Sequence, residues 1–124
     1  MEQLATPEEL AAFSQRFEFG DAIIRGVQLQ GNTCQIRLEC RVMHSGEWVR
    51  LTLLVDGLYA FRFSQPAPTA WNVISSQLTV LAEDKLFYLE LGGLPDPPGH
   101  ATDLLASPFF CSGRKLSYVI EAVT

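Results

Sequence analysis

The chain has 124 residues, of which 48% are hydrophobic and 19% charged, with a formal net charge of −5. This composition suits one packed domain over residues 1–124 and excludes a largely disordered chain. The acidic balance argues against nucleic-acid binding, and no apolar run approaches the ~20 residues of a membrane span. No basic stretch followed by an apolar one marks an export signal, so we expect a cytoplasmic protein that binds neither nucleic acid nor membrane.

The N-terminal segment has the pattern of a short helix. Thr6 can cap its start, and Glu9, three residues later, completes a capping box. Leu10, Phe13 and Phe17 then recur at spacings of three and four, which gives one apolar face. We expect this helix to pack on the apolar side of a sheet.

Three strands with alternating apolar and polar residues follow, over 21–30, 34–43 and 47–55. A two-residue turn at Gly31-Asn32 places Ile23 opposite Cys40, and a second tight turn at Ser45-Gly46 places Arg41 opposite Arg50. In this register one apolar layer contains residues 23, 27, 29, 34, 36, 38, 40, 42, 49, 51, 53 and 55.

The pattern after residue 55 predicts further antiparallel strands. At Asp56-Gly57 we favour a bulge or a wide turn, because a tight hairpin would bury Arg62 opposite Leu51. Strands are expected over 73–81 and 85–91, with Val80 opposite Phe87, and over 116–123. The predicted fold class is therefore α+β and mainly β: a single curved antiparallel sheet of about six strands, with the short N-terminal helix on its apolar face.

Residues 92–108 contain four prolines and three glycines and exceed the length of an ordinary connecting loop. The loop carries Asp96, His100 and Asp103, whose side chains are of the types that bind divalent cations, but their spacing matches no metal motif and solvated loop residues are the favoured interpretation. We therefore predict no metal site, no cofactor and no catalytic residue.

Three cysteines are present, and apolar residues flank them. Cys34 and Cys40 lie too far apart on one strand to form a disulfide with each other. We favour buried thiols, with a bond from either residue to Cys111 as the alternative.

The second side of the predicted sheet mixes charged and aromatic residues, a composition that is enriched at the centres of protein interfaces. The alternative is that the C-terminal strands or the helix cover these aromatic side chains as part of the core. The candidate binding residues are Arg37, Glu39, Arg41, Trp48 and Arg50, extended by Tyr59 and Phe61.

Two segments resemble small bacterial proteins. In Phe19-Gly-Asp-Ala-Ile-Ile-Arg-Gly-Val-Gln-Leu29 an aromatic-x-Asp-Ala stretch opens a strand, and Leu51-Thr-Leu-Leu-Val-Asp-Gly-Leu-Tyr-Ala-Phe-Arg-Phe63, with Asn72-Val-Ile74 after it, carries a Gly-aliphatic-x-x-Phe stretch. This layout resembles uncharacterised bacterial domains and immunity proteins of polymorphic toxin systems, although Gly20 stands where those proteins often have histidine. The resemblance implies a non-enzymatic protein and supplies no catalytic residues.

The leading functional hypothesis is a non-enzymatic, immunity-like domain that binds a protein partner through the charged and aromatic side of the sheet. The alternative is a small-molecule-binding domain in which the 92–108 loop forms a lid. A third hypothesis, a hydrolase or metal-dependent enzyme, requires His100 and Asp103 to meet a third ligand. A homodimer formed through an edge strand is compatible with each hypothesis.

Overall fold

The computed structural model describes residues 1–64, 77–92, 94 and 96–123. Part of the strand expected over 73–81 therefore lies outside the described residues, as does Asn72-Val-Ile74. The elements are β1 (Glu2–Leu4), α1 (Pro7–Arg16), β2 (Phe17–Gln30), β3 (Thr33–Val42), β4 (Trp48–Phe63), β5 (Thr79–Glu83), β6 (Leu86–Glu90), the 3-10 helix η1 (Ala101–Ala106) and β7 (Phe109–Ala122).

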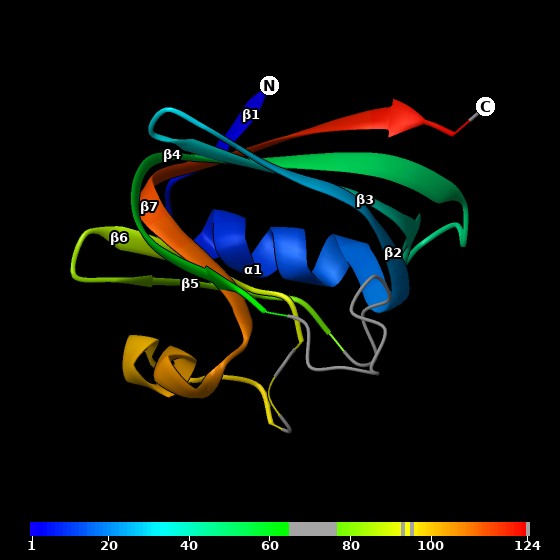
Figure 1. Cartoon of the computed structure of the whole chain (residues 1–124). Helices are drawn as coiled ribbons and strands as arrows, with labels where there is room; N and C mark the ends of the chain where they lie inside the picture. Colours follow the sequence, from blue (N-terminus) through cyan, green and yellow to red (C-terminus); the bar gives the residue numbers. More distant parts are fainter. Residues whose placement is uncertain (65–76, 93, 95, 124) are drawn as a thin grey trace.

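The strands form one open antiparallel sheet in the order β2-β3-β4-β7-β6-β5. The short strand β1 lies off this path and pairs with residues 116–118 of β7. The long strands β4 and β7 pair along most of their length. One half of the sheet adds β2, β3 and β1 to them, and the other half adds β6 and β5. Figure 1 shows the sheet curving around α1, which lies on its concave side. The predicted fold class is confirmed, and the strand that the sequence did not reveal is β1.

The sheet bends where β4 and β7 pass each other. Gly57 has a φ of +64°, and the pairing shifts by one residue between Leu58 and Ala60. Opposite this bend, a Cβ at Gly113 would lie 2.6 Å from Val55 Cγ1, so only glycine lets the two strands approach this closely. The tight hairpin that the sequence argued against is absent, because β4 continues through residues 56–57. The irregularity expected at Asp56-Gly57 lies slightly later, between Leu58 and Ala60.

Helix α1 begins with the predicted capping box. Thr6 Oγ1 accepts a hydrogen bond of 3.1 Å from the Glu9 N–H, and a Glu9 carboxylate oxygen accepts one of 3.0 Å from the Thr6 N–H. The Phe13 ring packs at centroid distances of 5.3 Å from Phe17 and 5.0 Å from Tyr118. Phe17 is the first residue of β2 and not part of the helix, yet it is buried in the same cluster.

The pairing of β2 with β3 follows the prediction from Gly26 to Gln30 and differs from it on the N-terminal side of Gly26. A bulge at Arg25 shifts the register by one, so Ile24 faces inward opposite Leu38 while Ile23 lies opposite Glu39 on the outer side. The predicted position of Ile23 in the apolar layer is therefore wrong. Leu29, near the hairpin end, is 44% exposed.

The pairing of β3 with β4 is shifted by two residues from the predicted one. Cys40 lies opposite Val49, because the turn contains four residues and is closed by a hydrogen bond of 2.8 Å from the Val42 N–H to the Glu47 carbonyl. A two-residue shift leaves every side chain on its predicted side, so the apolar layer survives while its partners change. The β5–β6 pairing is shifted in the same way, with Val80 opposite Leu89.

Neither helix in the described part of the chain is long and apolar enough to cross a membrane.

Candidate functional site

The candidate site is the outer side of β2, β3 and β4, which is the side of the sheet that faces away from α1. Alternation along the strands brings the polar side chains here because their neighbours, such as Leu38 and Leu51, are fully buried on the inner side. Glu39 lies opposite Arg50, and Arg41 lies opposite Trp48. The predicted Arg41–Arg50 pairing is wrong because the register is shifted by two residues. The shift replaces a repulsive pair of arginines with an attractive Glu39–Arg50 pair.

Glu39 holds two arginines from neighbouring strands. Its Oε2 accepts hydrogen bonds from Arg25 Nε at 3.0 Å and Arg25 Nη2 at 2.8 Å, while Arg50 Nη2 lies 3.7 Å from Oε1. The hydrogen bonds from Arg25, together with the positive charges of both guanidinium groups, hold the pKa of Glu39 below its usual range. Glu39 therefore remains ionised and orients both arginines.

Arg37 lies on the same outer side, opposite Gly26 and Thr52. A Cβ at Gly26 would lie 2.7 Å from Arg37 Nη2, so the guanidinium group occupies the space that a side chain would need. No acidic partner within 4 Å is found for Arg37 among the described residues. Arg25, Arg37, Glu39 and Arg50 together line a shallow depression of about 260 Å³.

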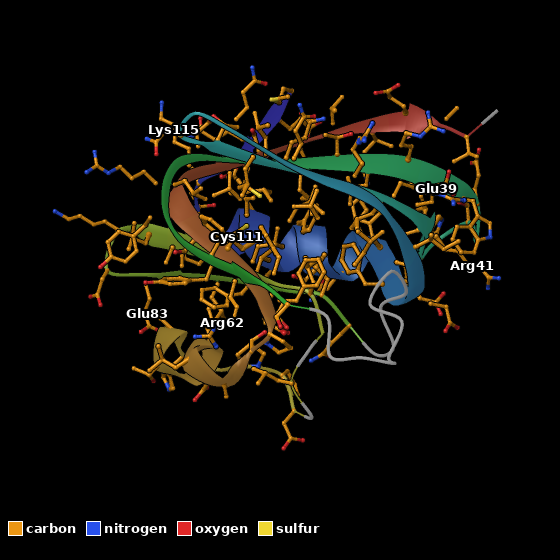
Figure 2. All side chains as sticks on the ribbon, viewed as in Figure 1. Glu39, Arg41, Arg62, Glu83, Cys111 and Lys115 are labelled. Carbon is orange, nitrogen blue, oxygen red and sulfur yellow. The ribbon has the colours of Figure 1, made fainter. Side chains whose placement is uncertain are left out.

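Sequence reasoning missed Arg25, because the unbroken register placed it in the inner row between Ile23 and Val27. A charge in an otherwise apolar row was the signal for the bulge that turns Arg25 outward. Figure 2 shows Glu39 and Arg41 at the same end of the curved sheet, far from the labelled Arg62 and Glu83.

Arg41 and Trp48 form the rim of this site. The Arg41 guanidinium carbon lies 5.1 Å from the centroid of the Trp48 ring, within the range of a cation–π contact. Trp48 remains 37% exposed, so neither the C-terminal strands nor the helix covers it fully. The site thus combines an arginine–tryptophan pair with a depression lined by three arginines and Glu39, which contacts two of them.

The structure does not bring Tyr59 and Phe61 together with these residues. Both lie in the second half of β4, where Phe61 pairs with Cys111 of β7. Tyr59 is 72% exposed beside the bulge, and the Phe61 ring stacks on Phe63 at 5.6 Å. Tyr59 lies nine positions after Arg50, which corresponds to at most about 30 Å along the strand. We therefore treat them as a separate exposed patch.

The 92–108 loop is fixed to the sheet by hydrogen bonds. Arg62 Nη1 donates to the carbonyl of Leu105 at 2.7 Å, and the buried Glu90 accepts a bond of 2.8 Å from Ser107 Oγ. Glu83 Oε2 accepts a further bond of 3.1 Å from the Ala101 N–H. In Figure 2 the Arg62 and Glu83 side chains extend toward η1.

The polar side chains of this loop have structural partners. Asp103 Oδ2 accepts hydrogen bonds from the Gly99 and His100 N–H groups at 3.0 and 3.1 Å, and His100 Nδ1 lies 3.5 Å from Glu83 Oε2. Asp96 is exposed. Within the residues that the structure describes, no three histidine, cysteine or acidic side chains form a cluster suited to a metal ion.

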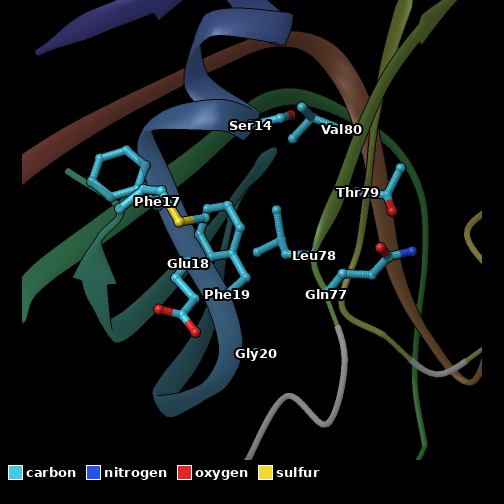
Figure 3. A pocket seen from close by; sticks show the side chains of 10 residues that line it. Ser14, Phe17, Glu18, Phe19, Gly20, Gln77, Leu78, Thr79 and Val80 are labelled. Carbon is cyan, nitrogen blue, oxygen red and sulfur yellow. The ribbon is translucent and has the colours of Figure 1, made fainter. Parts of the chain in front are cut away.

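A second depression, of about 440 Å³, lies between β2 and β5 (Figure 3). Its walls are four consecutive residues of each segment, 17–20 and 77–80, with Ser14 of α1 at one end. Phe19 and Leu78 give it an apolar floor, and both are 5% exposed. None of the described residues of the 92–108 loop lines this depression, so the geometry provides no support for that loop as its lid.

The three cysteines are buried free thiols, as favoured from the sequence. Burial raises the pKa of Cys40 to about 12. A hydrogen bond between Cys34 and Cys111, together with burial, raises the pKa of Cys111. The same hydrogen bond lowers the pKa of Cys34. All three side chains are fully buried, so none is accessible to a substrate in solution.

Comparison with protein-family models, with curated proteins and with solved structures finds no match for this chain.

Proposed function

We propose that the protein is a non-enzymatic binding domain that docks an acidic protein partner through its arginine face, which we define as Arg25, Arg37, Arg41 and Arg50 with Glu39 and Trp48. The observation that carries this proposal is charge segregation. Four of the nine lysines and arginines gather on this one face with three carboxylates, Glu39, Glu18 opposite Arg41 and Glu121 opposite Arg50, so the face is net positive although the chain as a whole has a net charge of −5. Such a face attracts an acidic surface and repels a basic one.

The arrangement favours binding because two of the arginines, Arg25 and Arg41, are already held in place. Glu39 fixes Arg25 with two hydrogen bonds, and Trp48 supports the Arg41 guanidinium group. Side chains that are ordered before binding lose less conformational entropy when a partner docks. Arginine and tryptophan also dominate the energetic centres of protein interfaces.

Immunity-like neutralisation of a partner protein is the biological role that the sequence resemblance implies, and a basic face suits an acidic partner. We also place the protein in a reducing compartment such as the cytoplasm, because its three cysteines are free and buried.

Affinity capture with the intact chain tests the proposal. The double substitution Arg41→Gln/Trp48→Ala removes the arginine–tryptophan pair, and Lys85→Gln/Arg114→Gln serves as the control because it removes two positive charges elsewhere. We expect a captured protein whose yield falls at least tenfold with the first variant, stays within twofold with the control, and decreases with added salt.

Equal capture by the native chain and the Arg41→Gln/Trp48→Ala variant would contradict the proposal. Size-exclusion chromatography at several protein concentrations shows whether the partner is instead a second copy of the chain. Self-association that survives the double substitution would also count against the arginine face.

The depression between β2 and β5 supports small-molecule binding as a second candidate function. Its floor is apolar and its rim carries Ser14, Glu18 and Thr79, a mixture that is typical of sites for amphipathic ligands. Fluorescence of 1-anilinonaphthalene-8-sulfonate tests this candidate. We expect enhancement with the native protein and its loss with Leu78→Trp, which fills the depression; no enhancement with the native protein would remove this candidate.

A further inference from the structure

We propose that Arg25, Arg37 and Arg50 form a subsite for a phosphoryl group carried by the partner protein. This inference rests on the proposed function, because it specifies what the arginine face recognises. The three guanidinium groups come from β2, β3 and β4, and they line one depression of about 260 Å³ together with Glu39. The ligand class is a phosphate monoester on a protein side chain.

Charge is the first argument. The depression contains three guanidinium groups and one carboxylate, which leaves a local charge of +2 by three minus one. Glu121 lies opposite Arg50 on β7, but it is exposed and does not line the depression. A phosphoserine, phosphothreonine or phosphotyrosine side chain carries about −1.5 to −2 charges at neutral pH and therefore neutralises the cluster, whereas one carboxylate would leave it positive.

The number of acceptor atoms is the second argument. A phosphate monoester presents three terminal oxygens, so it can accept hydrogen bonds from three guanidinium groups at once, while a carboxylate presents two oxygens. Glu39 already supplies a carboxylate to this cluster, and its two oxygens engage Arg25 and Arg50. Arg37 has no acidic partner among the described residues, which leaves its donors available to an incoming anion.

The backbone makes room for this ligand. The bulge at Arg25 turns that side chain outward, beside the Gly26–Arg37 pair. Because Gly26 has no side chain, the Arg37 guanidinium group lies against the strand and leaves the depression open above it. Arg25 and Arg50 retain side-chain exposures of 55% and 43%, so solvent and a partner reach both.

The test uses the full chain with inorganic phosphate, a phosphoserine peptide, the same peptide with serine, and acetate as probes. Binding is followed by NMR of the arginine Nε–Hε groups and by isothermal titration calorimetry. We expect saturable shifts at Arg25, Arg37 and Arg50 with phosphate and with the phosphoserine peptide, and at least fivefold weaker binding of acetate and of the serine peptide.

Arg37→Gln and Arg41→Gln form a matched pair, because both remove one positive charge from the outer side of β3 and only Arg37 lines the depression. We expect Arg37→Gln to weaken phosphate binding at least tenfold and Arg41→Gln to change it less than twofold. Equal losses in the two variants, or shifts that never saturate, would overturn the subsite. Binding of free phosphate without binding of the phosphoserine peptide would overturn the assignment to a partner protein.

The two proposals fail separately. If phosphate does not bind while Arg41→Gln/Trp48→Ala still abolishes partner capture, the subsite is wrong and the binding face stands. If phosphate and the phosphopeptide bind but capture is insensitive to the double substitution, the proposed docking face is wrong.

Discussion

Substituting Gly113 by alanine tests whether the close approach of β4 and β7 builds the curved sheet. The added Cβ would lie 2.6 Å from Val55 Cγ1 and 2.7 Å from the Asp56 carbonyl oxygen. Ordinary contacts of this kind lie at about 3.5 to 4.0 Å, so the two strands must separate by roughly 1 Å. The oxygen belongs to the backbone and cannot rotate away as a side chain would.

The magnitude follows from two opposing effects. Forcing an extra methyl group into a packed interior costs about 1 to 3 kcal/mol, and the immovable oxygen places this site in the upper half of that range. Replacing glycine reduces the entropy of the unfolded chain, which returns about 0.4 to 1 kcal/mol. We therefore expect Gly113→Ala to lower the free energy of unfolding by about 2 kcal/mol, equivalent to roughly 5 to 10 °C in Tm for a chain of this size.

Equilibrium urea denaturation, followed by circular dichroism, measures this change. Gly99→Ala is the matched control, because its nearest neighbouring atom beyond the adjacent residues is Asp103 Oδ2 at 4.0 Å. We expect the control to lie within about 0.5 kcal/mol of the native protein. A loss of less than about 0.5 kcal/mol in Gly113→Ala would refute the conclusion that this contact requires glycine.

Three further predictions concern particular side chains. Thr6→Ala should lower the free energy of unfolding by about 1 kcal/mol in urea denaturation, since it removes the helix cap; no loss would mean that the Thr6–Glu9 box does not stabilise α1. The folded state holds the pKa of Glu39 below its usual range, so its ion pairs stabilise the protein above that range and their contribution disappears as pH falls through the lowered pKa. The stability difference between native protein and Glu39→Gln should therefore shrink on acidification, and a difference that is constant with pH would contradict the pairing with Arg25. Cys40 should react with a thiol reagent only in denaturant, because it is fully buried with a pKa raised to about 12; rapid modification of the folded protein, with the site identified by mass spectrometry, would show otherwise.

The sequence predicted correctly those features of the fold that are determined by residues close together in the chain. The capping box of α1 involves residues three apart, and alternation over residues 34–42 places Cys34, Ile36, Leu38 and Cys40 on the buried side. The pairing partners were harder to predict. A register shift of two residues keeps every side chain on its own side, so the apolar pattern is the same in both registers and only the length of the turn decides between them.

The candidate site could be predicted only in part for the same reason. Arg37, Glu39, Arg41, Trp48 and Arg50 share the outer side in either register, and the sequence predicted that side for all five. Their contacts depend on the register and on the bulge at Arg25. The prediction therefore placed Arg41 opposite Arg50 and omitted Arg25. The bend in β4 likewise separates Tyr59 and Phe61 from the site, and alternation within one strand contains no information about such a bend.

The pairing of β1 with β7 constrains the order in which the parts of this protein can fold. Glu2 lies opposite Tyr118, and the Tyr118 hydroxyl donates a hydrogen bond of 2.6 Å to Glu2 across 116 positions of sequence. During synthesis on the ribosome, residues 2–4 therefore have no strand to join until residues 116–118 have emerged. Contacts between such distant residues slow folding, so we expect the pairing of β1 with β7 to form late. Until then residues 2–4 of the nascent chain remain accessible to chaperones.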